Sequence, residues 1–234
     1  SEDLSEIYSG GKTTVFNDGP TAFNFPSSNL DAAGLQMHLD ADAAFSQTFV
    51  TAPAIDFGGL GPIFNQSSCE NCHVRNGKGL LPSIDGDKNS GSLMRLSIPG
   101  YSPTDGNIRV PGFGFQLQTK AILGETPEGS ISSTDVQKLV AFLDGTSTTI
   151  SKKNYFITNT YIPLPGNVQT SFRTAPAIFG LGLVEAIAAS DILKHADPDD
   201  LDKDGISGKP NYVYDIPTKS MILGKYGWKA GQPT

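Results

Sequence analysis

The stretch "FNQSSCENCHVRNGKG", residues 64–79, holds both cysteines of this 234-residue chain, Cys69 and Cys72, followed directly by His73. The pattern C-x-x-C-H is typical of a site that attaches haem c. Residues three apart share a face of a helical turn, so each cysteine can reach one vinyl group of a porphyrin as a thioether. His73 is then expected to be the axial ligand of the iron. The motif therefore predicts one covalent haem c.

Two other interpretations of the cysteine pair have weaker support. A thioredoxin-like dithiol needs a βαβ setting, and the flanking "FNQSS" and "RNGKG" do not supply one. A zinc site needs two further ligands, yet His38 and His195 stand alone without motif spacing. Because haem c is attached outside the bacterial cytoplasm, the haem interpretation predicts an exported protein, in the periplasm or on the cell envelope.

The composition limits the partners and the kind of fold. A net charge of -7 with 18% charged residues leaves no basic stripe, so we expect no nucleic acid partner. No run approaches the ~18 apolar residues of a membrane span. With 26 glycines and 16 prolines, turns should be frequent, and a cofactor can supply part of the core.

Hydrophobic periodicity predicts helices in three places. Residues 29–49 read as a helix capped by Asn29 or Asp31, and a short helix is expected to carry Cys69 to His73. The stretch 179–197 reads as two short helices, the second capped by Ser190.

A short strand or turn is expected at 92–100, and a strand at 153–162. The run "DVQKLVAFL", 135–143, is ambiguous, because its apolar spacing fits a helix whereas the following Asp144-Gly145 is a hairpin signal. These elements predict a mainly α, cytochrome c-like, loop-rich fold with a small antiparallel β insertion at about 93–175, α+β overall. We expect an irregular arm over 1–28 and a single haem-binding domain over 29–234.

The stretch "DDLDKDGISG", 199–208, has the D-x-D-x-D-G core of a calcium loop. Its expected ligands are Asp200, Asp202, Asp204 and the carbonyl of Ile206, with Asp197 and Asp199 as further candidates. Asn211 occupies the twelfth position, so the loop is not an EF-hand, and a solvated acidic turn is the alternative.

Several other side chains are candidates for roles around a haem. Arg75 and Lys78 follow the motif and could neutralise the propionates, unless they are ordinary surface residues. His38 is the first candidate for a distal ligand, ahead of His195 and three methionines. Glu185, an acid in an apolar helix, is either structural or an acid/base for peroxide cleavage.

Four blocks, at 49–79, 173–187, 197–213 and 224–234, resemble the bacterial di-haem oxidoreductases, described as peroxidases and as thiol oxidoreductase-like cytochromes. The resemblance implies a redox role, with a peroxide-type substrate and a protein or small-molecule electron donor. It also implies two C-x-x-C-H sites, whereas this chain has one. We therefore expect an N-terminal half, poorly active without the second-haem domain of the same protein. Two alternatives remain: a non-enzymatic electron-transfer cytochrome, or a calcium-stabilised envelope module with an unoccupied motif.

Overall fold

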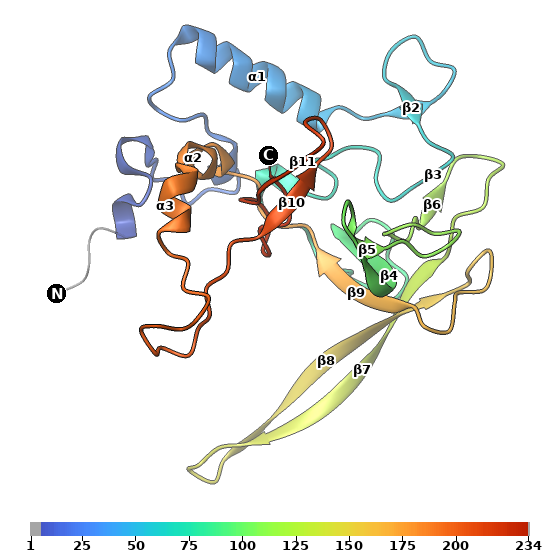
Figure 1. Ribbon diagram of the computed structural model, residues 1–234. Coiled ribbons are helices and arrows are strands. Elements are labelled where there is room, and N and C mark those ends of the chain that lie inside the picture. Colours follow the sequence, from blue (N-terminus) through green and yellow to red (C-terminus); the bar gives the residue numbers. More distant parts are fainter. Residues whose placement is uncertain (1–5, 234) are drawn as a thin grey trace. The chain divides into compact units, whose positions relative to one another are not determined.

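A computed structural model describes residues 6–233, and Figure 1 shows their helices and strands. The chain forms two compact units. We call Val15–Pro99 with Arg109–Ala177 the motif unit, because it contains the C-x-x-C-H sequence. The C-terminal unit consists of Ser1–Thr14, Gly100–Ile108 and Ile178–Thr234. The arm and domain boundaries drawn from the sequence stay predictions.

Helix is the minor component of the described residues. The three α-helices there, α1 (Ala32–Ser46), α2 (Leu181–Ala186) and α3 (Ala189–Leu193), contain 15, 6 and 5 residues. By contrast, the strands β7 (Ser130–Ala141) and β8 (Ser147–Thr158) contain 12 residues each. The prediction of a mainly α, cytochrome c-like fold is therefore wrong, and the chain is built mainly of strands and loops. Frequent glycines and prolines keep most helical turns short.

The helix expected over 29–49 is confirmed as α1. The Oδ1 atom of Asp31 accepts a hydrogen bond from the Gly34 N–H at 2.8 Å, so Asp31 rather than Asn29 is the cap. The two short helices expected over 179–197 are also confirmed, as α2 and α3. The cap predicted at Ser190 is wrong: α3 begins after Ala188, and Ser190 lies inside it.

The main strand pairing of the motif unit is antiparallel. Strand β4 (Ser92–Ser102) pairs with β9 (Gln169–Thr174), in a register that runs from Ser92↔Thr174 to Ser97↔Gln169. The sheet order is β5-β4-β9. The stretch 92–100, expected to be a short strand or a turn, is therefore a strand.

The shorter elements mostly form two-stranded pairs or single turns. The pairs are β1 (Val50–Thr51) with β2 (Gly58–Leu60), β3 (Ile63–Phe64) with β6 (Lys120–Ala121), and β10 (Tyr212–Asp215) with β11 (Ser220–Leu223). Strand β5 is Gly106–Ile108, and the 3-10 turns are η1 (Glu6–Tyr8), η2 (Gly11–Thr13), η3 (Ala22–Asn24) and η4 (Val74–Asn76).

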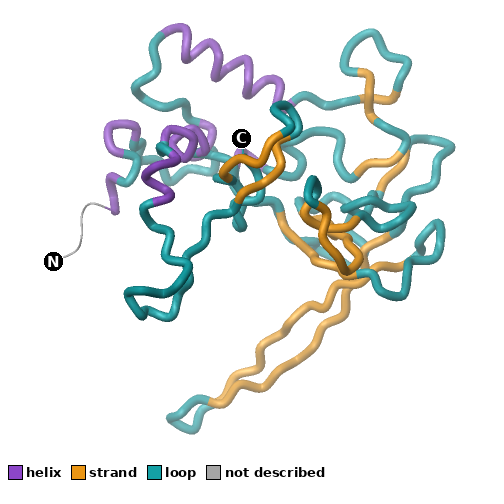
Figure 2. Tube along the Cα trace, viewed as in Figure 1, coloured by secondary structure: helices purple, strands orange, loops and turns teal. Residues whose placement is uncertain are grey.

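Strands β7 and β8 form one long hairpin, seen in Figure 2 as two extended strands joined by a short turn. The register continues without interruption from Ser130↔Thr158 to Ala141↔Ser147. In the turn, Asp144 Oδ1 accepts from the Thr146 N–H at 3.0 Å, and Gly145 has φ +84. The ambiguous run 135–143 is thus a strand up to Ala141, in agreement with the hairpin signal at 144–145.

The buried core lies in the motif unit, against β4 and β9. Its members are Met94, Leu96, Val110, Phe113 and Leu117. The rings of Tyr155 and Phe172 stack over it with centroids 3.6 Å apart. This core stabilises the sheet of β4 and β9. The motif in turn depends on the end of that sheet for its position. No helix of the described residues is long and apolar enough to cross a membrane.

Candidate functional site

The C-x-x-C-H sequence forms a single backbone turn. The N–H groups of Cys72 and His73 both donate to the carbonyl of Cys69, at 3.1 and 3.0 Å. Ser68 Oγ accepts from the Asn71 N–H at 3.1 Å and closes the start of the turn. The short helix expected over 69–73 is wrong: these residues form turns and bends, and the nearest helical element is the 3-10 turn η4, which follows His73 and in which Arg75 already has φ 53. One turn is still enough to present Cys69 and Cys72 together.

The two thiols differ in environment. Cys69 is exposed, Cys72 is half-buried, and both are free. Burial raises the pKa of the Cys72 thiol, while the positive charge of Lys120 opposes that rise. The half-buried sulfur is therefore mostly protonated at neutral pH.

A backbone carbonyl from a distant segment holds His73. The Nδ1 atom of His73 lies 2.7 Å from the carbonyl oxygen of Pro176, which follows β9. A carbonyl can only accept, so Nδ1 carries the proton and Nε2 keeps a lone pair for a metal. The ring of Phe45, on α1, lies beside the imidazole with centroids 6.0 Å apart. Sequence reasoning gave no role to Pro176 or Phe45.

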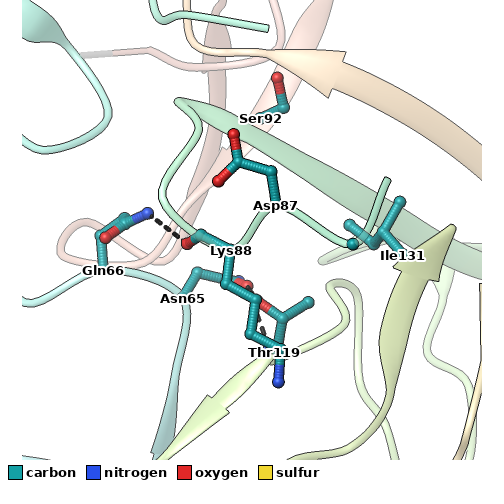
Figure 3. Close-up of a pocket in the computed structure, with 8 residues that line it drawn as sticks. Asn65, Gln66, Asp87, Lys88, Ser92, Thr119 and Ile131 are labelled. Atoms are coloured by element: carbon teal, nitrogen blue, oxygen red, sulfur yellow. Dashed lines mark hydrogen bonds between the residues drawn. The ribbon is translucent and has the colours of Figure 1, made fainter. Parts of the chain in front are cut away.

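Two polar side chains just before the motif tie it to the segment that precedes β6 and to the loop that precedes β4. Asn65 Nδ2 donates to the Leu117 carbonyl at 3.0 Å, and Asn65 Oδ1 accepts from the Thr119 N–H at 3.1 Å. Gln66 Nε2 donates to the Lys88 carbonyl at 2.9 Å. Figure 3 shows Asn65 and Gln66 lining a small hollow with Lys88 and Thr119. We assign these residues to anchoring the motif, a role that no sequence motif signalled.

The charged residues after the motif, Arg75 and Lys78, are both exposed. Among the described residues, neither side chain has a hydrogen bond or an ion pair.

His38 lies on the half-buried face of α1, together with Asp42 and Phe45. Seven residues along a helix span about 10 Å, so His38 lies that far along the axis from Phe45. Met94, another candidate ligand, is only 1% exposed in the core. His38 therefore lies on the side of α1 that faces the motif. Met94 has a packing role in the core.

The residues around the motif suit a haem. The donor set comprises two thiols in one turn and an imidazole whose Nε2 is free to ligate. Beside the motif in space lies Phe23, and Leu80 and Leu81 follow the motif in the sequence. Their side chains are 47%, 62% and 61% exposed, respectively. Such apolar side chains can cover the face of a porphyrin.

The acidic loop brings together a set of residues slightly different from the predicted one. Carboxylate oxygens of Asp197, Asp200 and Asp202 lie within 4.8 Å of one another. Asp204 is not in this cluster; its Oδ1 accepts from the Ile206 N–H at 2.7 Å, and the three clustered carboxylates also accept backbone N–H groups of the loop. From the sequence, Asp197 is only a further candidate ligand, because it lies outside the D-x-D-x-D-G core.

Glu185 lies exposed on α2, in the C-terminal unit. Desolvation, followed by the negative charge of Glu185, raises the pKa of Tyr226. Lys225 Nζ donates to the backbone carbonyls of Glu185 and Ile187, at 3.3 and 2.8 Å. The carboxylate of Glu185 thus acts electrostatically on Tyr226, whereas Lys225 contacts the backbone of α2 and of the residue that follows it.

A C-x-x-C-H turn whose histidine is held by a backbone carbonyl fits the class of c-type haem redox proteins. Comparison with family models gives a more specific assignment. The chain matches the family described as "Di-haem oxidoreductase, putative peroxidase" over residues 5–97 and 136–234, and it belongs to this family. No curated protein and no solved structure matches the chain.

Proposed function

We propose that the chain is the haem c-binding domain of a di-haem oxidoreductase with peroxidase-type activity. Cys69 and Cys72 form the thioether bonds, and His73 is the axial ligand. The observation that supports this most is the 2.7 Å contact between His73 Nδ1 and the Pro176 carbonyl. That bond fixes the tautomer in which Nε2 can bind iron, and it makes the imidazole a stronger electron donor.

A bound haem supplies one-electron transfer and, at an open iron position, a place for peroxide. The two cysteines would hold and orient the group, while His73 Nδ1–H donates its hydrogen bond to the Pro176 carbonyl. Arg75 and Lys78 neutralise the propionates, and His38 is the candidate distal ligand. Glu185 is the candidate acid/base for peroxide cleavage, which requires its carboxylate to reach the substrate in the complete protein.

The second haem belongs to another domain of the same protein. The family is di-haem, whereas this sequence has two cysteines and hence one C-x-x-C-H motif. We propose that electrons reach the pair from a redox protein or a small donor and leave to a peroxide. Haem c attachment requires export, so the expected location is the periplasm or the cell envelope.

A pyridine haemochrome spectrum of protein exported to a periplasm with haem-attachment machinery tests the assignment. Wild type should show the α band of a haem with two thioethers, retained after acid-acetone extraction. Cys69→Ala/Cys72→Ala should lose covalent haem, and His73→Ala should lose the axial ligand signature. His195→Ala, which removes an exposed histidine of the C-terminal unit, is the control for covalent attachment and should keep the covalent haem of wild type. Wild type without covalent haem would refute the proposal.

Peroxide binding separates an enzyme from an electron carrier. Peroxide-dependent oxidation of a donor by the full-length protein, lost in His73→Ala, supports the peroxidase. A haem that is six-coordinate and binds no peroxide in any redox state would leave electron transfer alone. In that case His38→Ala should open the sixth position if His38 occupies it.

We propose in addition that the acidic loop binds Ca²⁺ through Asp197, Asp200 and Asp202, with Asp204 and the Ile206 carbonyl completing the set. The proximity of the first three carboxylates supports this, because hard oxygen ligands suit Ca²⁺. Calorimetric titration should show binding that Asp202→Ala weakens. Asp191→Ala, an exposed aspartate paired with Lys194, is the control. Equal affinity in wild type and Asp202→Ala would leave a solvated acidic turn, with no calcium-stabilised module.

A further inference from the structure

Three backbone segments meet beside the motif in a closed ring of hydrogen bonds. The Gly79 N–H donates to the Ala175 carbonyl at 2.9 Å, and the Ala175 N–H donates to the Gly91 carbonyl at 2.8 Å. The Gly91 N–H donates to the Leu80 carbonyl at 2.9 Å. The ring extends the β4–β9 ladder beyond Ser92↔Thr174 and includes the chain that follows the haem motif. The motif is thereby tied to the end of the β4–β9 ladder.

Both glycines of this ring lie against the carbonyl of Cys72. A Cβ atom on Gly79 would lie 2.6 Å from that oxygen, and one on Gly91 would lie 2.5 Å from it. The Gly91 Cβ would also lie 2.6 Å from the Cα of Gly79. Both residues are buried, and neither has a positive φ. Space, rather than backbone conformation, therefore requires glycine at both positions.

The two partners in the histidine hydrogen bond are the next residues along the chain from this contact. His73 follows Cys72, and Pro176 follows Ala175, which belongs to the ring. Ordinary contact with a Cβ begins at 3.4 Å, so a methyl group on Gly79 requires separations of about 0.8 Å more from the Cys72 carbonyl and from the Gly91 carbonyl, which would also lie at 2.6 Å. A comparable displacement of His73 would take its Nδ1 from 2.7 Å to beyond the usual hydrogen-bond range of about 3.2 Å.

We propose that Gly79 and Gly91 are positioning residues for His73, because their missing side chains allow the approach that brings Nδ1 to the Pro176 carbonyl. This inference rests on the proposed function insofar as His73 is the axial ligand. The hydrogen bond itself involves protein atoms only, and it can be observed with or without haem.

The test is the His73 Nδ1–H signal in ¹⁵N-histidine-labelled protein, which has only three histidines to assign. Wild type should show a protected, downfield Nδ1–H, and Gly79→Ala and Gly91→Ala should lose it or exchange it at least about tenfold faster. In haem-loaded protein the same variants should shift the midpoint potential of the haem relative to wild type.

Gly166→Ala is the matched control, because Gly166 has no heavy atom near its Cβ position and no positive φ. It should keep both the Nδ1–H signal and the potential of wild type. Pro176→Ala retains the accepting carbonyl and should keep the signal as well. An unchanged signal in folded Gly79→Ala and Gly91→Ala, or an equal change in Gly166→Ala, would overturn the proposal.

A measurement on wild type covers the case in which the alanine variants do not fold. The α-protons of Gly79 and Gly91 should show a strong nuclear Overhauser effect, and the Nδ1–H should show one to residues 175–176. Absence of either effect in folded protein overturns the positioning role. If wild type takes up no haem yet shows both effects, the haem assignment fails while the positioning role stands.

Discussion

Asn65 offers the sharpest test of how the motif is anchored. Its side chain makes four hydrogen bonds: two donated to the Leu117 carbonyl and Gln118 Oε1, and two accepted from the N–H and the hydroxyl of Thr119. A typical hydrogen bond contributes about 1 kcal/mol net. Four bonds through one part-buried amide are not independent, and water can replace some of them. We expect Asn65→Ala to lower the free energy of unfolding by about 2–3 kcal/mol.

Urea unfolding of haem-free protein, followed by circular dichroism, measures this loss. For a chain of this size, it corresponds to a fall in Tm of roughly 5–10 °C. The control is Asn154→Ala, which removes an exposed asparagine from β8 and should change stability by less than about 0.5 kcal/mol. A loss in Asn65→Ala no larger than in the control would show that the amide does not hold the motif against residues 117–119.

Three further substitutions test the core, the hairpin and one buried acid. Leu117→Ala, at a side chain with 0% exposure, should cost about 2–5 kcal/mol in urea unfolding, whereas Leu143→Ala at the exposed hairpin end should cost almost nothing. Gly145→Ala places a side chain at φ +84, so hydrogen exchange of the amides at the β7–β8 end should accelerate while haem uptake stays unchanged. Burial raises the pKa of Glu128 above its ordinary 4.5, against a smaller lowering by the Gln118 N–H. The fold therefore favours the protonated acid, and this stabilisation is lost as pH rises through the raised pKa. Glu128→Gln should flatten that decline in the urea midpoint, and an unchanged pH dependence would contradict the assigned cause.

Local sequence signals were reliable where one segment contains all the necessary information. The helix capped by Asp31 and the Asp144-Gly145 turn depend on neighbours within a few residues. The fold class was predicted wrongly because a cytochrome c-type motif suggested helices around it. Residues 135–143 fit a helix by spacing, and only pairing with β8 along the whole hairpin made them a strand.

The chemistry of the site could be read from five consecutive residues, since Cys69, Cys72 and His73 carry their reactive atoms in one turn. The sequence by itself therefore determined the candidate cofactor and the family. Only the tertiary structure decided what orients the histidine, because the Pro176 carbonyl lies 103 residues away and any residue there would supply the same oxygen. A backbone acceptor leaves no side-chain signature in a sequence, and the space that Gly79 and Gly91 leave for the Cys72 carbonyl exists only once the sheet has brought the segments together.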